Sequence, residues 1–119
     1  CTKAGFVPKD RDAPERAKGL LAGVPQDEVV DGSHCLHPRF VEACLARSRE
    51  NLRLQALDLV YLHNPEAQLG HVQRAVLHER IRRAFAVLEA ARGRGELVAY
   101  GVATWSGLRR PTGDPGALE

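Results

Sequence analysis

Leu57-Asp58-Leu59-Val60-Tyr61-Leu62-His63-Asn64-Pro65 is the most informative segment of this sequence. It is a nearly continuous apolar run that ends in a histidine, and an Asn-Pro pair stops it at once. Runs of this kind are typical of parallel α/β sheets, whose strands are covered on both faces. In such sheets the side chains that act on a substrate lie at the carboxyl ends of the strands. The segment therefore predicts a buried strand that ends at His63 on the active edge.

Amphipathic helices are predicted before and after this strand. The first runs from Pro38 to about Leu54, with proline in its first turn, where this residue is favoured. The second begins near Glu79 and is stopped by Gly93 and Gly95. Each helix has one face that we expect to pack on the sheet. The positions on these faces are Val41, Cys44, Leu45, Ser48 and Leu52 in the first helix and Ile81, Ala84, Phe85, Leu88 and Ala91 in the second.

Two further strands complete the predicted order of strand, helix, strand, helix, strand. Leu97 to Ala103 is a second buried strand, and Cys1 to Phe6 has the composition of a strand end. Helices between apolar strands indicate parallel crossovers. Three parallel strands leave two long unpaired edges, and a complete (β/α)8 barrel takes about 250 residues. We therefore expect residues 1–119, which begin with cysteine and contain no methionine, to be one partial barrel domain.

The remaining segments are predicted to be connections. Val7 to Gly32 is rich in proline, glycine and charge, and it predicts a long loop with one helical turn at Pro14 to Leu21. Loops of this length inside compact domains often carry function. Glu66 to His78 is predicted as a polar connection, and the chain beyond Trp105 as another loop, because neither shows a clear period.

The composition excludes several classes of partner. The net charge of +2 is small and evenly spread, which does not indicate a nucleic-acid or membrane-surface partner. No apolar run approaches the roughly 20 residues that span a bilayer, and no signal segment opens the chain. The three cysteines are odd in number and irregularly spaced, which favours reduced thiols over a disulfide framework. A cytoplasmic location is therefore expected.

Three places qualify as sites of chemistry because they lie at the predicted carboxyl ends of strands. They are Lys3, His63 and the corner Ala103-Thr104-Trp105. Each also has a simpler interpretation, because lysines are usually solvated, a histidine at a strand end is often a packing residue, and corner residues often only line a wall. Alternation along the strand gives one side that is inward if His63 is catalytic. This side carries Leu57, Leu59, Tyr61 and His63.

The segment His34-Cys35-Leu36-His37 has residue types that bind metals, but its spacing matches none of the usual zinc patterns. We therefore predict no metal site. The chain also lacks a Gly-rich phosphate loop, a G-x-S-x-G elbow and a CxxC pair. Taken alone, the residues indicate a parallel α/β fold with an active edge and do not name a reaction.

Three segments together resemble the aldo-keto reductases. Thr2-Lys3-Ala4-Gly5 is similar to the "TK" that ends the family's third strand. Ser48-Arg49-Glu50-Asn51-Leu52, followed by the strand that ends at His63, is similar to the family's "SLxxL…DLYLIHxP". The segment from Leu88-Glu89 through Gly101-Val102-Ala103-Thr104-Trp105 is similar to "LExLxxxGKIRxxGVSNF". The motifs occur in the family's order, so the resemblance covers nearly the whole chain.

The resemblance implies part of a (β/α)8 TIM barrel, from the end of strand three to just after strand five. It also implies an NADP-dependent oxidoreductase that reduces an aldehyde or ketone to an alcohol. Lys3 matches the family's catalytic lysine, which makes a proton-donating tyrosine more acidic. His63 matches the histidine that orients the substrate carbonyl. The family's tyrosine and aspartate precede the lysine in the chain, so they fall before Cys1.

The corner after the last strand departs from the family's pattern. The family usually has Ser-Asn there, which holds the nicotinamide carboxamide, whereas this chain has Ala103 and Thr104. A threonine hydroxyl can donate and accept hydrogen bonds, so these two residues are the candidate NADP(H) contacts. Since the other cofactor-binding loops of the family lie on later strands, we expect the 119 residues alone to be inactive.

Two other functions remain open at this point. Barrels of this family also serve as non-enzymatic binding or regulatory subunits, and the change to Ala103-Thr104 is compatible with weakened redox chemistry. The second alternative is a different (β/α)8 enzyme that uses His63 as a metal ligand or a base.

Overall fold

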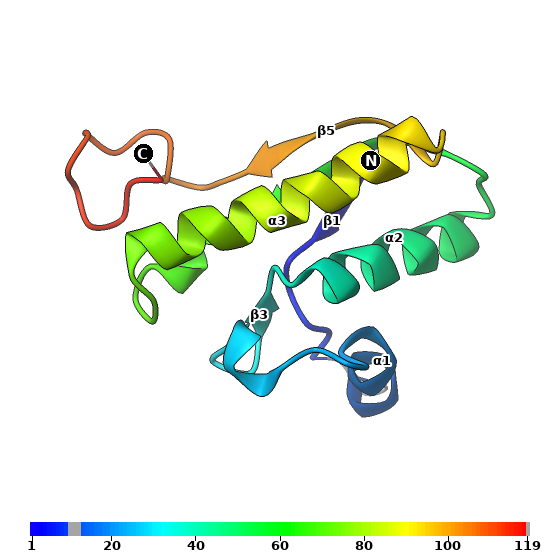
Figure 1. Ribbon diagram of the computed structural model, residues 1–119, viewed down its shortest axis with the longest axis horizontal. Coiled ribbons are helices and arrows are strands. Elements are labelled where there is room, and N and C mark those ends of the chain that lie inside the picture. Colours follow the sequence, from blue (N-terminus) through cyan, green and yellow to red (C-terminus); the bar gives the residue numbers. More distant parts are fainter. Residues whose placement is uncertain (10–12, 119) are drawn as a thin grey trace.

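The centre of the protein is a parallel sheet of three strands in the order β1-β4-β5. Two of these strands, β1 and β5, are labelled in Figure 1. The computed structural model describes residues 1–9 and 13–118. β4 (Leu57–His63) is the predicted buried strand and lies in the middle, between β1 (Thr2–Ala4) and β5 (Leu97–Ala103). All three strands predicted from the sequence are therefore confirmed, and so is their parallel direction.

Two long helices connect these strands. α2 (Pro38–Leu52) begins at the predicted proline, and its first turn is capped by His37, whose Nδ1 accepts a hydrogen bond from the backbone N–H of Arg39 at 3.2 Å. It ends at Arg53, which takes the left-handed conformation that commonly terminates helices. α3 (Arg74–Gly93) ends at the predicted glycine. The observed order of strands and helices is the one that parallel crossovers require.

The predicted start of the second helix near Glu79 is wrong, because α3 begins five residues earlier, at Arg74. The guanidinium of Arg74 donates hydrogen bonds to the backbone carbonyls of Asp114 and Ala117. Leu77, in the same first turn, is fully buried in the core. Contacts with distant parts of the chain hold this turn in place, and a search for local periodicity does not detect them.

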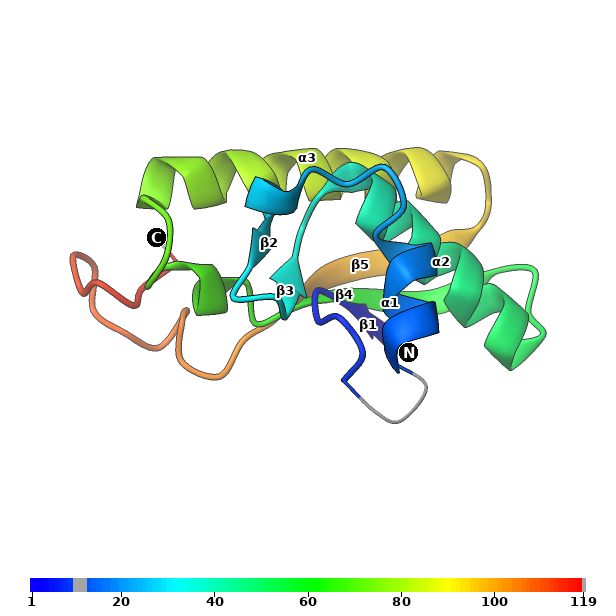
Figure 2. The same ribbon diagram turned by 90° about the horizontal axis from the view of Figure 1, so that it is seen from below.

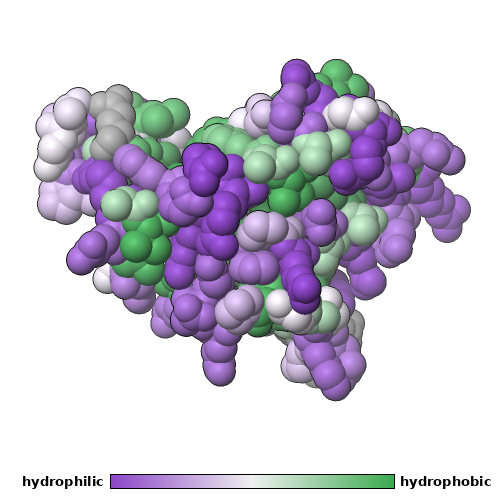
Figure 3. All heavy atoms as spheres, viewed as in Figure 1, coloured by the Kyte–Doolittle hydropathy of each residue, from purple (hydrophilic) through white to green (hydrophobic). Residues whose placement is uncertain are grey.

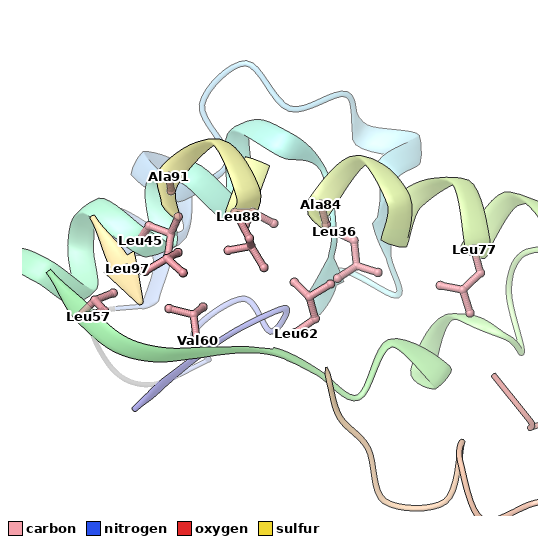
Figure 4. Packing of buried hydrophobic residues seen from close by; sticks show 11 residues of the cluster. Leu36, Leu45, Leu57, Val60, Leu62, Leu77, Ala84, Leu88, Ala91 and Leu97 are labelled. Atoms are coloured by element: carbon pink, nitrogen blue, oxygen red, sulfur yellow. The ribbon is translucent and has the colours of Figure 1, made fainter. Parts of the chain in front are cut away.

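Both helices cover the same face of the sheet, and in the described part of the chain no helix lies on the other face (Figure 2). Val60 and Leu62 of β4 point toward the helices and are completely buried beneath Leu88 and Ala84 of α3 (Figure 4). The structure is thus an α/β arrangement with a parallel sheet that is covered on one side. The remaining residues of this core are Leu36, Val41, Leu45, Leu57, Leu77, Ala91 and Leu97.

The predicted loop between Val7 and Gly32 contains more structure than expected. The helical turn predicted at its centre is confirmed as the short helix α1 (Ala13–Leu20). The assignment of 26–32 to the loop is wrong in part, because a 3-10 turn, η1 (Gln26–Glu28), leads into an antiparallel hairpin of β2 (Val29–Val30) and β3 (His34–Cys35). Strands of two residues show no alternation. Residues 10–12 of this loop, like residue 119, lie outside the described part.

The turn of this hairpin is made by Asp31 and Gly32, whose φ angles of 49° and 58° are both in the left-handed region. An Asp-Gly pair is a strong hairpin signal because it adopts this conformation readily. The hairpin brings β3 against the end of β1, where Phe6 and His34 form an antiparallel bridge. The Asp-Gly pair is therefore a signal for this hairpin that the sequence analysis did not use.

The surface over the helices is mainly hydrophilic, with scattered apolar patches (Figure 3). Ion pairs with i,i+3 spacing lie on α3, for example between Arg82 and Glu79 and between Arg92 and Glu89. Exposed pairs of this kind contribute little stability, because water and salt screen their charges. Among the helices of residues 1–9 and 13–118, none combines the length and the apolar character needed to cross a membrane.

Candidate functional site

The predicted site residues meet on the open face of the sheet, at the carboxyl end of its strands. Lys3 in β1 pairs in register with Tyr61 in β4, and His63 at the end of β4 pairs with Ala103 at the end of β5. Because side chains alternate along a strand, Lys3, Tyr61 and His63 share the face that the helices leave free. The structure thus brings Lys3, His63 and Ala103 to one edge, across three neighbouring strands.

The predicted alternation along β4 holds for most of the strand. Leu59, Tyr61 and His63 are partly exposed on the open face, whereas Val60 and Leu62 are buried. Leu57 is an exception, because it is only 3 % exposed and belongs to the core with Leu97. Both residues begin their strands beneath the C-terminal end of α3 (Figure 4), so the helix covers them there.

The imidazole of His63 is held in its neutral form. Partial burial lowers its pKa from the ordinary value of 6.5, and the positive charge of Lys3 lowers it further, whereas the carboxylate of Glu66 opposes this shift. A neutral imidazole carries one N–H donor and one acceptor nitrogen. Near neutral pH, His63 can therefore donate a hydrogen bond to an oxygen on the open face without bringing a second positive charge beside Lys3.

Sequence reasoning missed the role of His34, which it considered only as a metal ligand. The Nε2 of His34 lies 2.8 Å from the backbone carbonyl oxygen of His63, and its Nδ1 lies 3.0 Å from Nε2 of Gln68. Neighbouring residues of the segment are engaged elsewhere, since Cys35 Sγ accepts from the backbone N–H of His37 at 3.4 Å. The described residues contain no group of three or more side chains placed to hold a metal ion.

Gly5 leaves the space in which His34 meets His63. Its φ is +142°, and a Cβ atom there would lie 2.9 Å from the carbonyl oxygen of His63 and 3.0 Å from Nε2 of His34. Phe6 then packs its ring against both imidazoles edge-on, with centroid distances of 4.8 Å to His34 and 5.0 Å to His63. The glycine after the Thr-Lys-Ala of β1 is therefore required by close approach as well as by backbone conformation.

The corner after β5 is organised by Glu66, which sequence reasoning assigned to a plain connection. Its Oε1 accepts hydrogen bonds from the hydroxyl of Thr104 at 2.5 Å and from the backbone N–H of Trp105 at 2.9 Å. Burial raises the pKa of Glu66, but hydrogen bonds from Thr104 and from nearby backbone groups outweigh burial and lower it overall. The carboxylate is therefore charged at neutral pH and fixes the corner.

These contacts define the hydrogen-bonding positions that Thr104 still has free for a ligand. Its hydroxyl hydrogen is directed at Glu66, and the hydroxyl oxygen accepts from the backbone N–H of Gly107 at 2.8 Å. A hydroxyl oxygen has two lone pairs, so Thr104 retains one acceptor position. The backbone carbonyl of Ala103 already accepts from the N–H of Asn64 at 2.6 Å. The corner thus offers Thr104 as an acceptor for an incoming N–H group.

The geometry defines a parallel α/β protein whose polar side chains gather at the carboxyl edge of the sheet. The chain belongs to the aldo/keto reductase family, a family of oxidoreductases, since the model of the "Aldo/keto reductase family" matches residues 12–110. The predicted resemblance is therefore confirmed. The match includes His63, Ala103 and Thr104 but begins after Lys3. Comparisons with curated proteins and with solved structures each gave no match.

Proposed function

We propose that the full-length protein containing these residues reduces an aldehyde or ketone to an alcohol with NADPH as the hydride donor. The observation that carries this proposal is that Lys3 and His63 lie on the open face of the sheet, at the carboxyl ends of neighbouring strands. The family membership of the chain supports an oxidoreductase. The nature of the substrate and of the cofactor is part of the proposal.

His63 acts on the substrate by hydrogen bonding. Its neutral ring donates one N–H to the carbonyl oxygen, which orients the carbonyl and stabilises the negative charge that develops on this oxygen. A histidine at the end of a central strand is well suited to this role because the strand fixes its backbone. The bound cofactor supplies the hydride.

Lys3 acts on a proton donor. Its ammonium group favours the phenolate form of a nearby tyrosine, which makes that tyrosine a stronger acid. Neither tyrosine of this chain suits the task, since Tyr61 lies deeper in the same face than His63 and Tyr100 donates its hydroxyl to Glu89 at 2.7 Å on the helix side. We therefore place the proton-donating tyrosine, and the aspartate that pairs with the lysine, on other residues of the full-length protein.

Thr104 and Ala103 are the proposed NADP(H) contacts. The remaining acceptor position of Thr104 suits the amide N–H of a nicotinamide carboxamide. Ala103, opposite His63 in the register, contributes a small side chain where the ring would approach. This fit is consistent with a nicotinamide lying next to the carbonyl site, so that hydride donor and acceptor are adjacent.

The proposed architecture is part of a (β/α)8 barrel. The three strands are parallel, the connecting helices cover one face, and both β1 and β5 have a free edge in the described part of the chain. Further strands added at these edges would close the sheet and turn the open face with Lys3 and His63 into the barrel interior. A cytoplasmic location remains a prediction from the sequence.

The experiment is a nicotinamide oxidation assay on the full-length protein with a panel of aldehydes and ketones. We expect NADPH-dependent reduction that falls at least ~100-fold in kcat/KM in His63→Ala and in Lys3→Met. Matched controls are His71→Gln and Lys9→Met, which change an exposed histidine and an exposed lysine. Full activity of both site variants would refute the assigned roles.

One observation favours a second function, which is a binding or regulatory subunit. The hydroxyl of Thr104 already makes hydrogen bonds with Glu66 and Gly107. We therefore expect it to bind a carboxamide more weakly than the family's usual Ser-Asn pair. Tight NADPH binding without turnover of any carbonyl would support this function. Turnover that requires an added metal ion and no nicotinamide would instead indicate a different (β/α)8 enzyme that uses His63 as ligand or base.

A further inference from the structure

A network of buried polar groups runs from the end of β4 through β3 and α3 to η1. The carbonyl oxygen of His63 meets Nε2 of His34 at 2.8 Å, and Nδ1 of His34 meets Nε2 of Gln68 at 3.0 Å. Arg80 of α3 donates from its Nη1 to Oε1 of Gln68 at 3.0 Å. An ion pair at 3.2 Å joins Nε of Arg80 to Oε2 of Glu28. These contacts thus link five elements of the protein, which are β4, β3, the 3-10 turn η2 (Pro65–Gln68), α3 and η1.

The chemistry of the groups fixes the direction of every hydrogen bond in this network. A carbonyl oxygen only accepts, so Nε2 of His34 carries the hydrogen and Nδ1 carries the lone pair. The amide nitrogen of Gln68 then donates to Nδ1, and its amide oxygen accepts from Arg80. A second proton on His34 would place two donors face to face. The hydrogen-bond network therefore selects one neutral tautomer of His34, in agreement with the burial that lowers its pKa.

These groups are buried where an unpaired polar atom is costly. The exposed fractions of His34, Gln68 and Arg80 are 1 %, 0 % and 6 %. Buried polar side chains are retained where their partners satisfy them, and a satisfied network is rigid. Arg80 also donates from its Nη2 to the backbone carbonyl of Asp27 at 3.0 Å, so its charge is held by the turn η1 as well as by Glu28.

The hydrogen-bond network holds His63 on the side of β1, where the pairing of strands has ended. On the β5 side, the backbone N–H of the next residue, Asn64, still reaches the carbonyl of Ala103 at 2.6 Å. On the β1 side, the last register pair is Ala4 with Leu62, and the strand turns away at Gly5. Asn64 itself takes the left-handed conformation. His34 replaces the missing strand as the partner of the His63 carbonyl, beside the ends of β1 and β4 (Figure 2).

We propose that His34, Gln68 and Arg80 are positioning residues that lock the peptide carbonyl of His63 and thereby set where its imidazole meets the substrate oxygen. This inference rests on the proposed function, in which His63 contacts the substrate. None of the three residues needs to touch the substrate. Their effect is geometric, because small displacements of a group that contacts the reacting atoms cost large factors in rate.

The test uses Gln68→Leu in the full-length protein, because Gln68 is two hydrogen bonds away from the His63 carbonyl and leaves His34 in place. We expect kcat to fall about tenfold while the KM for NADPH stays unchanged. In a His63→Ala background the same substitution should cause no further loss, because there is no imidazole left to position. Gln55→Leu, which changes an exposed glutamine, should match the wild type.

The outcomes separate this inference from the proposed function. If His63→Ala keeps wild-type kcat, the proposed function fails. If His63→Ala is impaired but folded Gln68→Leu keeps wild-type kcat, or if the two losses multiply in the double variant, the positioning role is overturned while the proposed function stands. Circular dichroism and thermal unfolding establish that each variant is folded.

A spectroscopic measurement tests the same hydrogen-bond network and needs no activity assay. Nitrogen-15 NMR of the wild type should show His34 as a single neutral tautomer with its proton on Nε2. In Gln68→Leu the proton should stay on Nε2, but the Nδ1 resonance should shift because Nδ1 loses its hydrogen-bond donor. A proton on Nδ1 of His34 in the wild type, or an unchanged spectrum in folded Gln68→Leu, would contradict the proposed network. This measurement decides the case even where a variant is too unstable for kinetics.

Discussion

We expect replacement of Gly5 to be poorly tolerated, even by a residue as small as alanine. Its φ of +142° is a conformation that residues with a side chain rarely adopt, and a Cβ would collide with the carbonyl oxygen of His63. We expect Gly5→Ala to lower the free energy of unfolding by about 1–3 kcal/mol. Chemical denaturation of the full-length protein measures this change.

The control for this prediction is Gly93→Ala. Gly93 lies in α3, and a Cβ there meets no atom within 4 Å. Alanine is favoured over glycine in helices by about 1 kcal/mol, so this variant should be as stable as the wild type or more stable. Equal destabilisation by both substitutions would show that close approach at Gly5 is not the cause.

The two histidines at this edge predict how stability depends on pH. Burial lowers the pKa of His34 from 6.5, and burial together with Lys3 lowers that of His63. Below about pH 6.5 the unfolded chain takes up protons that the folded chain resists, so the free energy of unfolding falls as the pH drops toward the folded pKa values. Above about pH 6.5 both states are neutral at these residues, which then add no pH dependence.

For His34 alone, the loss is at most about 1.4 kcal/mol per pH unit. We therefore expect guanidinium denaturation at about pH 7.5 and about pH 5.5 to show a decrease in stability that is smaller in His34→Gln. His71→Gln, at an exposed position, should keep the wild-type slope. A wild-type protein that is equally stable at both pH values would contradict the assignment of neutral buried histidines.

The site shows how far single residues are predictable from the sequence. His63 and Thr104 were predicted as candidates because they lie at the carboxyl ends of apolar strands, where active edges are expected. His34, Gln68 and Glu66 were not identified as parts of the site, since their partners are 29, 34 and 38 positions away along the chain. Contacts of such separation depend on the assembled fold, and neither composition nor periodicity records them.

The strands and helices follow from periodicity wherever they are long. β4 and α2 were predicted to within two residues, because β4 is a nearly continuous apolar run stopped by Asn-Pro and α2 has an apolar face that repeats over several turns. The hairpin of β2 and β3 has no such pattern, although the Asp31-Gly32 turn indicates it. The early start of α3 depends on Arg74, which reaches the C-terminal loop. The long elements were therefore predicted, whereas the short hairpin and the ends set by long-range contacts were not.

The packing of α3 on β4 gives a prediction for this pair of elements. Leu88 is completely buried against the core, whereas Leu52 at the end of α2 is 51 % exposed. We expect Leu88→Ala to lower the free energy of unfolding by about 2–5 kcal/mol, through lost burial and the cavity it leaves. Leu52→Ala should change it by about 0.5 kcal/mol or less. Similar effects of the two substitutions in denaturation experiments would show that α3 does not pack as described.

For the molecule as a whole, the open face of the sheet decides what the chain can do alone. Lys3 and His63 lie on this face, and no helix of the described part covers it. The fold class could be predicted from the sequence because parallel strands and crossover helices repeat. The complete site could not, because in the proposed barrel the interior would be built from all of its strands, of which this sheet would supply three.

The proposed barrel leads to a prediction for the isolated 119 residues. Thr104 offers one acceptor position to a carboxamide, and one hydrogen bond contributes only about 0.5–1.5 kcal/mol. The cost of ordering a ligand is larger than this, at about 4 kcal/mol or more. Isothermal titration of NADPH into the isolated chain should therefore give no saturable heat, whereas the full-length protein should bind. Tight binding by the isolated chain would mean that these three strands already contain the cofactor site, and the proposed contribution of further strands would have to be abandoned.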